Sequence, residues 1–189
     1  SPARRLLDGQ LSKGEITELV SPQLSSGGAL VLTALLRKAC ENHQWIGLID
    51  GRDSFDPTSL DNAVLSRILW VRCNHADQAM KAADLILRDG NLPLVLLDLT
   101  INPNAELRKV TASNWYRLQR IIEKTSTSLL VVTPSPMVSS AQTRLSLNGR
   151  FTLDDLARPE IELLAQLNIK LVHRRMNEVL ESESVTQTA

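Results

Sequence analysis

The stretch SPQLSSGGA, residues 21–29, follows an apolar run at residues 16–20 and leads into a helix-like run at residues 29–41. A strand, a loop of small residues and a helix in this order form the setting in which many proteins hold phosphate groups, on backbone N–H groups at the start of the helix. The chemical question is whether this loop also carries the side chains that such a site needs.

A working phosphate loop follows the pattern G-x-x-x-x-G-K-[ST], in which the lysine reaches the terminal phosphates and the hydroxyl holds a magnesium ion. When Gly27 is placed at the second glycine, the first glycine falls at Pro22, the lysine at Gly28 and the hydroxyl residue at Ala29. Glycine has no charge to offer to phosphate, and alanine cannot bind magnesium. The pattern favours a turn that joins strand to helix over an ATP site.

Other polar groups give no clear ligand set. Ser25, Ser26 and the helix start are able to hold an anion only weakly. Cys40 and Cys73 lie in apolar segments, so we expect buried, reduced thiols and not a disulfide or metal site. The three histidines have no ligand spacing with them. We therefore expect neither a cofactor nor a metal ion.

The elements that would position these residues alternate along the chain. Apolar runs rich in Val, Ile and Leu predict strands at residues 16–20, 45–50, 68–71, 92–99 and 128–133. Their nearly continuous apolar character is typical of strands buried on both faces of a parallel sheet. Helical patterns cover residues 29–41, 75–89 and about 105–125, with Asn74 as an expected N-cap and Gly90 as an expected stop. The alternation predicts a doubly wound α/β fold.

The pattern changes after residue 134. Residues 144–147 and 150–153 predict a hairpin around the turn Asn148-Gly149, followed by a helical segment broken near Pro159 and a last strand at residues 168–175. We expect a single domain over residues 1–175, with a core at about 14–135 and a C-terminal extension at about 136–175. Residues 176–189 are polar and are expected to be a flexible tail.

Composition narrows the classes of protein. Lys+Arg and Asp+Glu both number 21, so the formal net charge is zero, which argues against a protein that coats nucleic acid by charge alone. No apolar run is long enough to span a membrane, and there is no secretory signal. We expect a soluble, cytoplasmic protein. Because the chain starts at Ser1 without a methionine, we also expect a trimmed piece of a longer protein.

A second stretch, LIDGRDSFDP at residues 48–57, carries a family resemblance. Together with the loop, it resembles the RecA family of recombination ATPases, in which the corresponding strand reads like IDAEHAFDP. The matching residues are Ile49, Asp50, Phe55, Asp56 and Pro57. The family places a catalytic glutamate two residues after the first aspartate, where this chain has Arg52. A guanidinium stays protonated and cannot act as a base.

A third stretch, LPLVLLDL, looks like the family's Walker B strand and ends near Asp98. In active relatives this acid orients magnesium through water, but an aspartate at the end of a buried strand is equally suited to capping a neighbouring helix. The order and spacing of the three stretches carry the resemblance, which covers about residues 14–135. It implies a RecA-like, P-loop NTPase-type sheet with degenerate nucleotide motifs.

A narrower resemblance is to the ImuA-type and SulA-labelled branch of RecA-like proteins, short bacterial proteins associated with SOS-induced mutagenesis. It is carried by DSFDP, RILWVRC, AMKAADLIL, LVLLDL, WYRLQRIIEKTSTSLLVVTP and RFTLDDLARPEIELLAQLNIKLVHRR. The resemblance implies an accessory role, in which the protein binds RecA or an error-prone polymerase component in the DNA damage response. The missing lysine, hydroxyl and glutamate fit a scaffold better than a motor.

Basic residues supply a candidate surface for a partner or for DNA. They are Arg108, Lys109, Arg117, Arg120 and Lys124 on the predicted long helix, and Arg174 and Arg175 near the end. Glu106 and Glu123 offset them, so a solvated helix face is the plainer interpretation. With zero net charge, we expect any DNA binding to be weak and salt-sensitive.

The sequence thus favours a non-hydrolysing RecA-like accessory protein that acts by protein contact in DNA repair, the SOS response or translesion synthesis, with no catalytic residue. Two alternatives stay open. One is a SulA-type inhibitor of cell division that binds a tubulin-like division protein. The other is a weak residual ATPase that uses Asp98.

Overall fold

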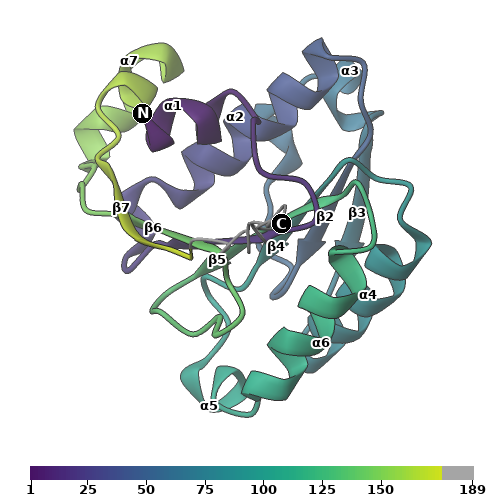
Figure 1. The fold of residues 1–189 in the computed structure, drawn as a ribbon. Helices are drawn as coiled ribbons and strands as arrows, with labels where there is room; N and C mark the ends of the chain where they lie inside the picture. The colour runs from purple at the N-terminus through teal and green to yellow at the C-terminus, as the bar shows by residue number, and fades with distance from the viewer. Residues whose placement is uncertain (176–189) are drawn as a thin grey trace, which may run out of the picture.

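The computed structural model of the protein describes residues 1–175, in which one seven-stranded sheet lies between two layers of helices (Figure 1). The strand order is β3-β2-β4-β5-β1-β6-β7. All neighbouring strands are parallel except β6 and β7, which are antiparallel. The predicted α/β fold, a mainly parallel sheet flanked by helices, is confirmed. The predicted flexible tail at residues 176–189 lies outside the described residues.

The predicted strands form close to their expected positions. They are β1 (Ile16–Val20), β2 (Ile46–Asp50), β3 (Ile68–Arg72), β4 (Leu94–Asp98) and β5 (Ser128–Thr133). Every residue of β1, β2 and β5 is buried. This burial explains the continuous apolar runs, because a strand covered by helices on both sides has no solvent face to mark with polar residues.

Two separate cores lie on the two faces of the sheet. In β5, Leu129 and Val131 pack with the helices of one layer, whereas Leu130 and Val132 pack with the other. Figure 1 shows α4 (Ala76–Asp89), α5 (Asn104–Leu107) and α6 (Ala112–Ile122) on one side. The other side carries α1 (Pro2–Leu7), α2 (Gly28–Glu41), α3 (Asn62–Leu65) and α7 (Glu160–Ala165). The period-two alternation of side chains in a strand divides the apolar residues between these layers.

Helix ends follow the expected signals with small shifts. Gly90 ends α4 in the left-handed conformation at φ 71°, which is the predicted stop. The N-cap of α4 is His75 and not the predicted Asn74. The predicted long helix at 105–125 is two helices, because Thr111 forms a capping box with Asn114 and starts α6 anew.

The predicted hairpin around Asn148-Gly149 is wrong. Strand β6 (Thr143–Leu147) pairs with β7 (Ile169–Arg174), and residues 150–153 form no strand. Between the two strands the chain makes a 3-10 helix, Leu153–Ala157, and then α7, for which Pro159 is the N-cap. Thr152 forms a capping box with Asp155, and this local helix start prevents a second strand arm. The break at Pro159 and the last strand are confirmed, and the domain boundaries stay a prediction.

Within the part of the chain that the structure describes, no helix combines the length and the apolar character needed to cross a membrane.

A buried ion pair fixes the path of the chain from β5 to β6. Glu18 of β1 is fully buried and accepts hydrogen bonds from the N–H groups of Met137 (3.0 Å) and Val138 (2.8 Å). Arg144 of β6 donates to the same carboxylate at 3.1 Å, and its other nitrogen donates to the Val138 carbonyl at 3.2 Å. Glu18 and Arg144 are also register partners of the two parallel strands. The carboxylate therefore ties the loop after β5 and strand β6 to the centre of the sheet.

We predict that Arg144→Met destabilises the protein by about 3–5 kcal/mol, because it leaves the buried charge of Glu18 without its partner. Urea unfolding followed by circular dichroism measures the change. The double variant Glu18→Gln/Arg144→Met removes the charge as well and should be more stable than the single variant. A cost below about 1 kcal/mol for Arg144→Met would contradict the anchoring role.

Candidate functional site: the carboxyl edge of the parallel sheet

The loop at residues 21–27 and the turns after β2 and β4 all leave the carboxyl edge of the parallel strands. In open α/β sheets, this edge is where ligands are bound. The loop contains a short 3-10 helix, Leu24–Ser26, and α2 starts at Gly28. The predicted strand–loop–helix order around the candidate phosphate site is therefore present.

Internal hydrogen bonds define the shape of the loop. The N–H of Gln23 donates to Ser26 Oγ at 3.2 Å, and the N–H of Ser26 donates back to the Gln23 carbonyl at 3.0 Å. The N–H of Ser21 donates to the carbonyl of Thr133 at 2.8 Å, which fixes the start of the loop to β5. Ser26 is buried and partnered within the loop. Its hydroxyl already serves to hold the turn.

The C-terminal extension covers the glycine at the centre of the loop. Gly27 has φ 102°, and a Cβ there would meet the side chain of Leu167 and lie 3.0 Å from Phe151 Cε2. The N–H of Phe151 also donates to the Ser25 carbonyl at 2.8 Å. Apolar side chains thus stand beside the backbone that would have to wrap a phosphate.

The position of the missing lysine is also closed. A Cβ added at Gly28 would lie 2.8 Å from Ser21 Oγ and 3.3 Å from Ser21 Cβ, and Ser21 is buried. The loop therefore offers no lysine, no metal-binding hydroxyl at Ala29 and no free space at residue 28. These residues do not fit a magnesium-bound nucleoside triphosphate.

Asp50, at the end of β2, serves the fold of the turn that follows it. Its carboxylate is buried and accepts hydrogen bonds from the N–H groups of Ser54 (2.9 Å) and Phe55 (2.8 Å) and from Trp70 Nε1 (3.2 Å). The rings of Phe55 and Trp70 meet edge to face, with centroids 5.3 Å apart. The turn that resembles the family pattern is therefore retained as a packed structural unit around Asp50.

Asp98, the Walker B-like residue, is the register partner of Asp50 on the adjacent strand. Its Oδ1 accepts hydrogen bonds from the N–H of Thr100 at 3.0 Å and from the Thr100 hydroxyl at 2.5 Å. Burial raises the pKa of Asp98 and outweighs the hydrogen bonds from Thr100, which lower it. The nearby charge of Asp50 raises the pKa further. The carboxylate therefore caps the turn that follows β4, which is the structural role that we considered for this residue beside magnesium binding.

Arg52, at the position of the family's glutamate, turns to a different partner. Its Nη1 donates to Glu106 Oε2 at 3.2 Å and to the Asn74 carbonyl at 3.2 Å. Glu106 also accepts from the N–H of Ala76 at the start of α4 and from Asn102 Nδ2. These bonds, chiefly the one from Asn102, hold the pKa of Glu106 below its usual range. Arg52 therefore joins the turn after β2 to α4 and α5.

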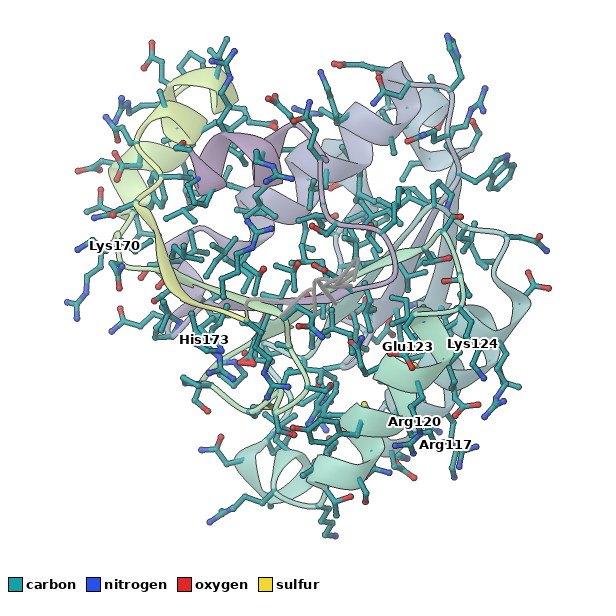
Figure 2. The ribbon with its side chains drawn as sticks, in the orientation of Figure 1. Arg117, Arg120, Glu123, Lys124, Lys170 and His173 are labelled. Carbon is teal, nitrogen blue, oxygen red and sulfur yellow. The ribbon has the colours of Figure 1, made fainter. Side chains whose placement is uncertain are left out.

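The structure divides the seven basic residues of the candidate patch among separate places. Arg117 and Arg120 lie on α6 and Lys124 lies just after its C-terminal end, far from Lys170 and His173 of β7 (Figure 2). Arg108 and Lys109 lie in the turn between α5 and α6. Arg174 lines a hollow beside α1, whereas Arg175 donates to Tyr116 Oη on α6 at 3.3 Å.

Of these three basic residues, Arg117 is paired with an acid of α4. Arg117 Nε donates to Asp84 of α4 at 2.7 Å, and Arg88 donates to the same carboxylate. Arg120 and Lys124 share a hollow of about 810 Å³ with Arg88 and Arg117. This smaller cluster is what remains of the predicted patch.

The largely apolar groove next to the loop was missed by the sequence analysis. It has a volume of about 760 Å³ and lies between the start of α2 and the segment 151–163. Its apolar lining includes Leu24, Ala29, Leu30, Phe151, Leu153 and Leu156. The signal in the sequence was the pair of leucines around two acids in LDDL, which the predicted hairpin arm obscured.

The described residues contain no group of three or more His, Cys, Asp or Glu side chains placed to hold a metal ion. Both cysteines are free; Cys73 is buried and Cys40 is half-buried. Burial raises the pKa of the Cys73 thiol, and the charge of Asp50 adds to this effect. A protonated thiol is a poor nucleophile and a poor metal ligand.

Comparison with known proteins gives a distant relationship. No family model matches the chain. The chain is 23% identical over 193 residues to Protein RecA of Acinetobacter baylyi, an alignment that covers 94% of this chain and 53% of that protein. It is 27% identical over 103 residues to Protein RecA of Chlorobaculum tepidum, which covers 52% of this chain and 30% of that protein. The chain thus spans about half of the length of the first relative, and its sequence and α/β fold are RecA-like.

We predict that Gly28→Lys/Ala29→Thr, which restores the missing loop chemistry, creates no nucleotide site. The added Cβ at residue 28 displaces buried Ser21, so we expect a loss of about 1–3 kcal/mol in unfolding free energy. Urea unfolding and calorimetric titration with magnesium ATP measure the two effects. Ala29→Thr alone is the control, because Ala29 is exposed. Tight nucleotide binding by the parent chain would show that the loop is a working site.

We predict that the change in unfolding free energy caused by Asp98→Asn, relative to the parent, is more favourable at pH 7 than at pH 4. A raised folded-state pKa means that the stability from the protonated group is present in acid and is lost as the pH rises through that pKa. Asn keeps an acceptor for Thr100 without the buried charge. Urea unfolding of parent and variant at both pH values measures the difference.

The matched control for this pH dependence is Asp56→Asn. Hydrogen bonds from Thr58 lower the pKa of Asp56, so its ionised form stabilises the fold at neutral pH. That variant should therefore lose more stability at pH 7 than at pH 4. The same sign of pH dependence for both variants would contradict the assigned environment of Asp98.

Proposed function

We propose that this chain is a non-hydrolysing RecA-like accessory protein that acts by protein contact in bacterial DNA repair. The observation that carries the proposal is the state of the loop at the carboxyl edge. Gly28 and Ala29 stand where lysine and a hydroxyl residue would act, and Phe151 and Leu167 lie against Gly27. A chain that keeps the RecA-like frame but closes the phosphate position is suited to binding partners and not to turning over ATP.

The polar residues of the edge support the same proposal. Asp50 and Asp98 accept hydrogen bonds from their own turns, and Arg52 is held by Glu106. The two carboxylates therefore stabilise the local fold with the groups that a catalytic role would have required, and the guanidinium of Arg52 cannot act as a base. In the proposal, the partner is RecA or a component of an error-prone polymerase, and the setting is the SOS response and translesion synthesis.

The decisive test combines hydrolysis and capture. We expect the purified chain to show no magnesium-dependent ATP hydrolysis above a blank. We also expect a tagged chain to retain RecA or a polymerase component from DNA-damaged bacterial cells, identified by mass spectrometry. Hydrolysis by the parent that is lost in Asp98→Asn would overturn the non-hydrolysing role. Capture of a tubulin-like division protein in place of a repair protein would overturn the repair role.

A further inference from the structure

The groove beside the closed loop exposes large apolar side chains. Leu24 is 76% exposed, Leu153 85% and Leu156 75%, and all three line the groove. Its floor is apolar too, since Leu163 is buried and Phe151 is half-buried. Leaving these leucines in water costs free energy that burial against another surface would recover. A groove of about 760 Å³ has room for several apolar side chains of a bound segment.

The wall of the groove is acidic, although the whole chain is neutral. Residues 151–166 carry four acidic side chains against one basic residue, Arg158, a net charge of −3. Arg158 pairs with Asp155 and Glu162, and Arg37 of α2 pairs with Glu160. Asp154, which lies between the exposed leucines and is itself exposed, takes part in no ion pair among residues 1–175. An arriving basic side chain would therefore find one acid that is unpaired within the described residues, Asp154, next to Leu153, beside a wall that stays negative when Arg37 is counted with it.

We propose that this groove binds an amphipathic segment of another protein that carries apolar side chains on one face and an excess of Lys and Arg along its border. The inference rests on the proposed function and names the surface and the kind of partner that it uses. Helical segments dock in such grooves through apolar anchors at i, i+3 or i+4 spacing. The acidic wall adds orientation and a faster encounter through opposite charge.

The negative charge of the groove wall also bears on two other possible occupants, the end of the same chain and a second copy of the chain. Residues 176–189 of the same chain contain three glutamates and no Lys or Arg, so like charges oppose their binding to this wall. A second copy of the chain would have to present a basic apolar face of its own. These two occupants are separate outcomes of the experiment.

The test places a photo-reactive benzophenone amino acid at Leu153 of the full chain, in DNA-damaged cells, and sequences the peptide that becomes attached. The control carries the same group at Leu85, which is 70% exposed on α4, on the opposite face of the sheet. We expect Leu153 to attach a peptide of another protein with periodic apolar residues and a Lys/Arg excess, and Leu85 not to attach it. Leu153→Ser/Leu156→Ser should reduce capture of that protein at least tenfold, whereas Leu85→Ser should change it less than twofold.

Attachment at Leu153 to residues 176–189, to a second copy or to an acidic segment would overturn the inference. Undiminished capture by Leu153→Ser/Leu156→Ser would also overturn it, while leaving the proposed function in place. If the parent chain captures no repair protein at all, the proposed function fails. The capture experiment decides this point without the cross-linking result. Because both leucines are exposed, we expect their serine variants to keep the unfolding transition of the parent.

Discussion

The buried carboxylate of Glu18 is the interaction on which the C-terminal part of the structure depends. A fully buried charge is tolerated only when its oxygens are occupied, and here two N–H groups and Arg144 occupy them. This requirement brings the loop after β5 back to β1 and sets the register of β6 beside it. The position of β6 in turn determines where β7 and the segment between them lie.

That segment decides the character of the candidate site. The chain leaves β6, crosses to the start of α2 and returns as β7, so that Phe151 and Leu167 come to lie against Gly27. The pair of Arg37 and Glu160 joins α7 to α2 in the same region. The extension therefore acts as a cover for the loop, and its outward leucines form the exposed border of the groove.

Around the loop, side chains that resemble a catalytic set have local structural partners. Asp50 organises the turn after β2, and Asp98 caps the turn after β4. Arg52, which stands where the family has a glutamate base, forms an ion pair with Glu106. The carboxylates of Asp50 and Asp98 accept hydrogen bonds from neighbours within the fold, as buried and half-buried carboxylates must. The RecA-like frame and a protein-binding role are compatible because the sheet needs these turns whether or not a nucleotide binds.

The sequence by itself determined the layered α/β fold, because continuous apolar strands and amphipathic helices leave few other ways to bury their apolar residues. It also determined what the loop lacks, since no packing supplies a charge to Gly28 or a hydroxyl to Ala29. Only the tertiary structure decided what lies against that loop. The approach of Phe151 to Gly27 joins residues more than a hundred positions apart, and the local Asn148-Gly149 turn signal pointed elsewhere. The tertiary structure also decided how the basic residues are separated. The chain breaks before α6, and the path of β7 takes Arg174 and Arg175 to different neighbours. Local periodicity specifies neither feature.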